Sequence, residues 1–166
     1  ETIKFHLEKA YYLSSNRRPG PVWIDIPANI QNAEINEKKL KGFKPKKQSK
    51  NNKKIKTQIK KIAYLLSKSK RPVLHLGQGV KISKGEKFLR KIIDRYNIPF
   101  ALTWNATDLI ESSHKSYVGR PGAFAERGTN FIIQNCDLHI AVGTRLPFMV
   151  TGYNAKDFAR KAKKLW

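Results

Sequence analysis

The chain has 166 residues, 40% of them hydrophobic, and a formal net charge of +22, a size that supports one well-formed core and a short piece of another. No apolar run approaches the roughly 20 residues needed to cross a bilayer, and the N-terminus lacks the basic-then-apolar order of a signal peptide. Cys136, the only cysteine, has no disulfide partner and no neighbouring base, so we expect a buried thiol in a soluble, cytoplasmic protein.

The first 30 residues predict a helix followed by a short strand. Apolar side chains recur at helical spacing up to about residue 16, at Ile3, Leu7, Ala10 and Tyr11. This spacing predicts a helix with one buried face, and the Pro19-Gly-Pro21 run that follows ends it. Residues 22–26 form a β-favouring run closed by Pro27, and we expect a buried strand there.

The middle of the chain, residues 31–53, has the composition of a linker. No acidic residue occurs between Glu37 and Glu86, whereas twelve lysines fall between Lys38 and Lys61. One interpretation is a basic module that binds polyanions or nucleic acid. The other is a solvated connector and helix face, which is favoured because the run has no arginine to grip phosphates bidentately. We therefore do not expect nucleic acid to be a partner.

Helix and strand patterns alternate in the second half. Helices are expected at about residues 55–66, 86–96 and 125–135, and strands at residues 73–77, 99–104 and 137–143. The strands are almost continuously apolar, which is typical of a parallel sheet covered by helices on both faces. With right-handed crossovers, the pattern predicts an α/β fold with a Rossmann-like doubly wound parallel sheet.

Residues suited to ligand binding stand at the carboxyl ends of these strands and in the loop before the last helix. They are Gly77, Gly79, Thr103, Gly122, Gly143, Thr144 and Arg145. Ligands bind at this edge of an open parallel sheet; glycine lets a phosphate approach the backbone, and arginine pairs with it. The alternatives are a tight turn without a ligand at Gly77 and Gly79, and a surface arginine at Arg145.

Catalytic clusters are not recognisable in the sequence. The four histidines, His6, His75, His114 and His139, are scattered and show no metal-ligand spacing. Paired carboxylates, a nucleophile elbow and a Walker loop are also missing. Trp104 offers a stacking surface but is expected to be a core residue, and Asp108 is expected to be a turn or cap residue.

Several strings resemble one enzyme family. The run Arg18-Pro-Gly-Pro-Val-Trp-Ile-Asp-Ile-Pro27 resembles the end of the pyrimidine-binding domain of thiamine-diphosphate enzymes related to acetolactate synthase. The central domain of that family is resembled by Trp104-Asn-Ala-Thr-Asp-Leu-Ile110, Gly119-Arg-Pro-Gly122, Asn135-Cys-Asp-Leu138 and Val142-Gly-Thr-Arg-Leu146. The resemblance implies that residues 1–30 end the first domain, 31–53 form a lysine-rich linker, and 54–166 form a central domain truncated at its C-terminal end.

The resemblance also implies a function for a parent enzyme. That enzyme uses thiamine diphosphate and Mg2+ to join or decarboxylate 2-oxo acids such as pyruvate, as a homodimer or homotetramer that includes the remaining domains. Its catalytic glutamate is expected upstream of Glu1, and its magnesium and diphosphate motif downstream of Trp166. The 166 residues alone are therefore expected to be inactive.

A flavin site is a further implication of the resemblance. The central domain holds FAD in acetolactate synthases, and the seven candidate binding residues match the family's glycine turn, strand-end threonine, loop glycine and glycine-x-arginine segment. Here Leu146-Pro-Phe-Met149 stands where those enzymes usually have Phe-Asp-Asp-Arg. This difference predicts a more apolar wall beside the site.

Overall fold

The computed structural model describes residues 2–16, 18–46 and 52–166. The chain divides into two compact units, residues 1–51 and residues 52–166. The first unit contains α1 (Ile3–Ser15), α2 (Ala28–Gln31) and the 3-10 turn η1 (Glu37–Lys39). Within residues 31–46 of the predicted linker, the structure has only the end of α2 and the turn η1.

Helix α1 confirms the helix prediction, but the predicted buried face is wrong. None of the side chains of α1 is buried, and Tyr11 is 75% exposed. The helix instead holds Phe43, whose ring lies 5.5 Å from the rings of both Phe5 and Tyr12. The backbone N–H of Phe43 also donates to Glu8 Oε2 at 2.6 Å. Two ring contacts with a single residue leave most of the helix surface in water.

The predicted strand at residues 22–26 is also wrong. These residues pair with no strand among the described residues, and Trp23 is 90% exposed. A strand is defined by hydrogen bonds to a neighbour, and the described part of the first unit offers none. The apolar pattern alone therefore did not produce a strand.

The second unit is built on a parallel sheet, as predicted. Its strands are β1 (Pro72–Leu76), β2 (Phe100–Leu102), β3 (Leu138–Val142) and β4 (Lys163–Leu165), in the order β2-β1-β3-β4. In the register, Leu76 of β1 lies beside Leu102 of β2 and Val142 of β3. The three predicted strands are thus parallel neighbours, and their carboxyl ends meet at one edge.

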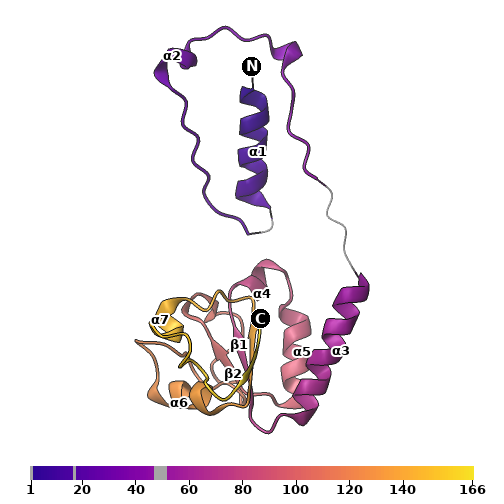
Figure 1. The fold of residues 1–166 in the computed structure, drawn as a ribbon, viewed down its shortest axis with the longest axis vertical. Coiled ribbons are helices and arrows are strands. Elements are labelled where there is room, and N and C mark those ends of the chain that lie inside the picture. The colour runs from indigo at the N-terminus through magenta and orange to yellow at the C-terminus, as the bar shows by residue number, and fades with distance from the viewer. Residues whose placement is uncertain (1, 17, 47–51) are drawn as a thin grey trace. The chain divides into compact units, whose positions relative to one another are not determined.

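Helices cover both faces of this sheet, which confirms the doubly wound α/β fold. On one face, the core contains Leu74 and Leu76 of β1 with side chains of α3 (Asn52–Lys68) and α5 (Glu86–Tyr96). On the other face, Val73 packs with Ile133 of α6 (Arg127–Asn135) and with Phe158. Alternate residues of β1 enter the two cores, as the strand period of two requires. Figure 1 shows the sheet between these helices.

Local sequence explains where the helices end. Helix α5 stops at Asn97, which adopts the left-handed conformation with φ 48°, a common helix ending. Helix α3 is followed by a loop that reaches Pro72. The proline disfavours the helical conformation for the residue before it, Arg71. Within the described residues, no helix is long and apolar enough to span a bilayer.

Candidate functional site at the carboxyl edge of the sheet

Backbone hydrogen bonds join the ends of three strands into one surface. The N–H of Thr103, just after β2, donates to Leu76 O at 2.9 Å. The N–H of Gly77 donates to Val142 O at 2.9 Å, and the N–H of Gly79 donates to Gly143 O at 2.9 Å. Four of the predicted site residues, Gly77, Gly79, Thr103 and Gly143, are therefore brought together. The short helix α4 (Gly79–Ile82) begins at the same turn.

The glycines at this edge are required by loop packing. A Cβ atom on Gly77 would clash with Gly143 O and lie 2.7 Å from the Cα of Thr144. A Cβ atom on Gly79 would lie 2.7 Å from the Cα of Gly143, and Gly143 itself has φ +65°. The tight-turn alternative thus accounts for these glycines, and the N–H groups of Gly77 and Gly79 already donate to the neighbouring loop.

Gly122 lies in a second loop that contacts other elements. Its N–H and C=O are both held by the side-chain amide of Asn130 of α6, each at 2.9 Å. A Cβ atom at Gly122 would lie 2.9 Å from Met149 O, in the short helix α7 (Phe148–Thr151). Its described contacts are thus with α6 and α7, and they do not include the Gly77–Gly79 turn.

Two polar side chains at the edge, those of Arg145 and Thr144, are open to a ligand, whereas the oxygen of a third, Gln78, is enclosed. Arg145 is exposed and takes part in no ion pair among the described residues. Thr144 Oγ1 accepts from the N–H of Leu146 at 3.2 Å, which leaves the hydroxyl hydrogen available. Gln78 Oε1 is buried with no hydrogen-bond partner in the described chain. An unsatisfied buried acceptor is uncommon, but this oxygen has almost no accessible surface and is not open to a ligand.

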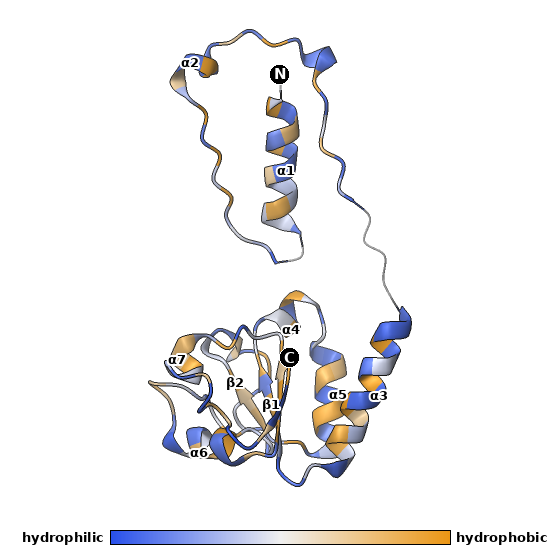
Figure 2. Cartoon of the chain, viewed as in Figure 1, coloured by the Kyte–Doolittle hydropathy of each residue, from blue (hydrophilic) through white to orange (hydrophobic). Residues whose placement is uncertain are grey.

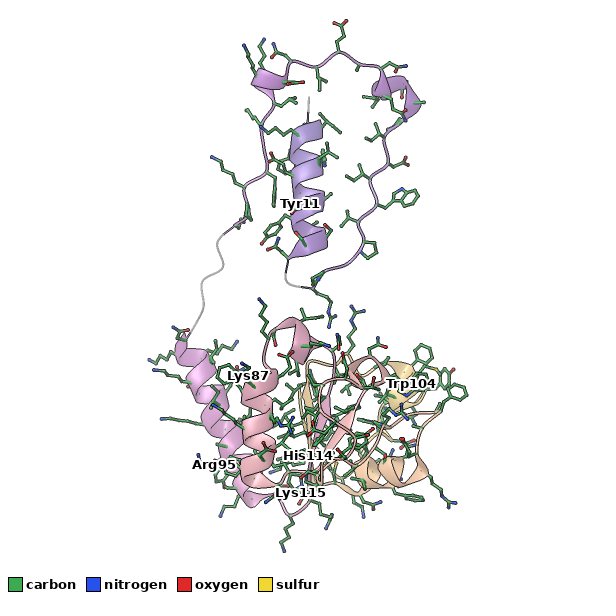
Figure 3. The ribbon with its side chains drawn as sticks, turned by 180° about the vertical axis from the view of Figure 1, so that it is seen from behind. Tyr11, Lys87, Arg95, Trp104, His114 and Lys115 are labelled. Atoms are coloured by element: carbon green, nitrogen blue, oxygen red, sulfur yellow. The ribbon has the colours of Figure 1, made fainter. Side chains whose placement is uncertain are left out.

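Two aromatic side chains in the segment after β2 are exposed. Trp104, in the 3-10 turn η2 (Trp104–Ala106), is 48% exposed, so the expectation of a core residue is wrong. Its ring lies 6.2 Å from that of Phe124, which is 74% exposed (Figure 3). The turn that follows places Asp108 in an ion pair with Lys81 of α4, which lowers the pKa of Asp108 chiefly through the hydrogen bond from Lys81.

The string at residues 146–149 forms part of an apolar wall. Phe148 is exposed, and its ring lies 5.5 Å from that of Tyr153. A cavity of about 480 Å³ lies between these residues, the Gly122 loop and α6, with Ile133 and Phe158 among its lining residues. Phe148 and Met149 thus line this cavity, and an apolar wall beside a ligand site stays a prediction.

The sequence analysis missed a buried histidine pair. His75 of β1 and His139 of β3 are both fully buried, with His75 Nδ1 and His139 Nε2 3.2 Å apart. Burial lowers the pKa of His75 to about 3, with His139 contributing, and lowers the pKa of His139 to about 4, with Lys164 contributing. The register pairs Val73 with His139, so the two histidines point to the same face. That register was the missing information.

Cys136 and Asp137 have structural surroundings. Cys136 is 1% exposed, and burial raises the pKa of its thiol to about 11, as expected for a thiol that is not a nucleophile. The Asp137 carboxylate accepts from Ser69 Oγ and from the N–H groups of Lys70 and Arg71. These bonds, Ser69 first, lower the pKa of Asp137. The carboxylate thereby clamps the loop between α3 and β1.

Metal chemistry has no candidate among the described side chains. Within these ranges, no group of three or more His, Cys, Asp or Glu residues is arranged to hold an ion. The carboxyl edge of the sheet remains the candidate site because it brings Gly77, Gly79, Thr103 and Gly143 together.

Comparisons with known proteins agree with this architecture. A family model described as the central domain of thiamine pyrophosphate enzymes matches residues 59–165. A probable acetolactate synthase large subunit of Methanocaldococcus jannaschii is 33% identical over 171 residues, which cover 98% of this chain and 28% of that protein. The acetolactate synthase large subunit of Corynebacterium glutamicum is also 33% identical, over 95% of this chain and 25% of its own length. The chain thus spans about a quarter of the length of these relatives.

Proposed function

Because the chain belongs to the family of thiamine pyrophosphate enzyme central domains, we propose that it serves a thiamine-diphosphate-dependent enzyme that joins or decarboxylates 2-oxo acids such as pyruvate. The observation that carries this proposal is the family match over residues 59–165, which include all four strands of the sheet. The similarity to acetolactate synthase large subunits supports the substrate class.

This chain and the rest of the enzyme have different roles. The catalytic glutamate and the motif that holds Mg2+ and the diphosphate of the coenzyme are assigned to the remaining domains. Residues 1–30 and the linker at 31–53 connect the central domain to them, and the complete enzyme is a cytoplasmic homodimer or homotetramer. The central domain contributes architecture and one ligand site.

The ligand assigned to that site is FAD or an adenine nucleotide along the carboxyl edge. The guanidinium of Arg145 fits a phosphate. The Thr144 hydroxyl is a second phosphate donor, and the exposed face of Trp104 suits stacking on a flat ring. Gly77, Gly79, Thr103, Gly122 and Gly143 shape the edge by letting the loops approach. FAD would supply a planar ring and a diphosphate here.

A domain exchange tests the proposed function. Residues 59–165 are placed in the Methanocaldococcus jannaschii relative in exchange for the segment that they match. We expect the chimera to form acetolactate from pyruvate only when thiamine diphosphate and Mg2+ are present. The chain of 166 residues, assayed in parallel, is expected to form none. A folded chimera without activity, or an active isolated chain, contradicts the proposal.

A further inference from the structure

Helix α5 carries a second apolar row that the core of the domain does not use. Leu89 and Ile93 of this helix are buried, with 8% and 0% of their surface exposed. Phe88, Ile92 and Tyr96 are nevertheless 71%, 45% and 59% exposed. They recur every four residues and therefore form one row along the helix. A regular exposed row of large apolar side chains is typical of a binding surface.

Helix α3 supplies a matching row across a groove. Ile55, Ile59 and Ile62 are 47%, 57% and 38% exposed. A groove of about 1150 Å³, the α3–α5 groove, is lined by Ile59 and Ile62 of α3 and by Ile92 and Tyr96 of α5. Its lining also includes Leu74, Ile140 and Val142 of the sheet, and Gly79 and Gly143 of the carboxyl edge. Figure 2 shows the apolar residues on these neighbouring helices.

Cations flank both apolar rows. On α5, Lys87, Lys91 and Arg95 each precede one member of the row, so they form a parallel line of positive charge. Figure 3 marks Lys87 and Arg95 on this helix. On α3, Lys56 and Lys60 each follow one member of its row, Ile55 and Ile59, and α3 contains no acidic residue. None of these five cations takes part in an ion pair among the described residues.

The two acids of α5 are Glu86, in the first turn, and Asp94, which is engaged by groups outside this line. Asp94 bonds to His114 at 2.9 Å and lies 3.9 Å from Arg90, and Arg90 pairs with Glu111. These contacts tie α5 to the segment after β2. The rims of the groove therefore stay positive, and they complement an acidic partner.

We propose that the α3–α5 groove binds an acidic amphipathic helix of a separate polypeptide. The apolar rows fit the i, i+3, i+4, i+7 anchors of such a helix, and its carboxylates face the lysines and Arg95. None of the described elements covers the exposed rows, and the positive rims favour an acidic helix as the occupant. A second copy of this chain is disfavoured because its formal charge is +22 and its own rims are positive.

Fluorescence anisotropy with synthetic peptides tests this proposal on the whole chain. The probe is a labelled amphipathic peptide of about 18 residues with leucines at helical anchor spacing and glutamates elsewhere. We expect it to bind, and the same peptide with lysines for glutamates not to bind. We expect Ile92→Glu, Ile59→Glu and Lys91→Glu each to weaken binding by at least about tenfold.

Phe131→Glu is the matched control. Phe131 is 54% exposed on α6, on the opposite face of the sheet, and we expect this variant to bind as the unchanged chain does. Because Lys91→Glu alters only an exposed side chain, it separates lost binding from misfolding, which circular dichroism also monitors. Equal binding of both peptides, or variants that bind like the unchanged chain, overturns the proposal.

Two further measurements address other occupants. Sedimentation showing a dimer that Ile92→Glu dissociates overturns the proposal in favour of a second copy. The titration is also repeated on a polypeptide extended to the length of the relatives. We expect binding to persist there, and its loss overturns the proposal because a segment of the same chain then covers the groove.

Discussion

His75 Nδ1 and His139 Nε2 lie 3.2 Å apart between β1 and β3, with both side chains fully buried. The other two ring nitrogens, His75 Nε2 and His139 Nδ1, have no hydrogen-bond partner in the described chain. Phe158 packs edge-on against the His139 ring at 5.1 Å. When both histidines are neutral, one ring N–H can donate to the ring nitrogen of the other. Protonation adds a charge that no described group compensates.

This pair predicts that the domain loses stability in mild acid. The pKa of His75 is lowered to about 3 and that of His139 to about 4, whereas unfolded histidine titrates near 6.5. The unfolded state therefore binds more protons than the folded state between pH 6.5 and about 4. The free energy of unfolding falls with falling pH in this window, by up to about 1.4 kcal/mol per pH unit for each histidine.

Urea unfolding at several pH values checks this prediction. The double variant His75→Leu/His139→Leu is expected to show a shallower dependence on pH over the same window. His6→Leu changes an exposed histidine of α1 and is the control. A double variant that keeps the full acid sensitivity would show that other groups cause it.

Gly143→Ala is expected to destabilise the second unit. Gly143 has φ +65°, and an added Cβ atom would lie 2.5 Å from Val80 N. The change combines a strained backbone conformation with a clash against another loop, so we expect a loss of more than about 1 kcal/mol. Thermal or urea unfolding measures it.

Gly128→Ala is the same chemical change as Gly143→Ala, but it is expected to have the opposite effect on stability. Gly128 lies in α6, and nothing stands within 4 Å of its added Cβ atom. Alanine favours the helix over glycine by about 0.5–1 kcal/mol, so this variant is expected to be more stable than the unchanged chain. Equal effects at the two positions would refute the packing role of Gly143.

The lysine-rich run is expected to bind DNA weakly and without sequence preference. A solvated connector attracts phosphates only through counterion release, so affinity falls steeply as salt rises. Titration of duplex and single-stranded DNA at rising salt measures this. Sequence-specific binding that resists salt would instead support the basic-module interpretation.

The sequence predicted the sheet because the three expected strands are nearly continuous apolar runs. Strands buried between two layers of helices require apolar residues such as Leu74, Leu76, Leu138 and Ile140. Strand β4, with the sequence Lys-Lys-Leu, carries no such pattern and exists through its pairing with β3. Residues 22–26 show the reverse, because an apolar run without a neighbour forms no strand.

The candidate site was only partly accessible to sequence reasoning. Glycine at positions 77, 79 and 143 indicated close approach of another group, but sequence does not say whether that group is a ligand or a loop. Contacts in the structure identify a loop. The His75–His139 pair depends on strand register, and the unsatisfied Gln78 Oε1 depends on burial. Neither can be read from residue spacing.

Equilibrium dialysis with FAD and with ADP, on the unchanged chain and on Arg145→Ala, tests the proposed ligand site most directly. Arg145 supplies a fixed positive charge at the carboxyl edge without an ion pair in the described chain. Its loss is expected to weaken binding by about 1.5–3 kcal/mol, the scale of a hydrogen bond to a charged group. We predict binding of at least one of the two nucleotides and this loss in the variant. Unchanged affinity in Arg145→Ala, or no binding by either protein, would contradict a nucleotide site at this edge.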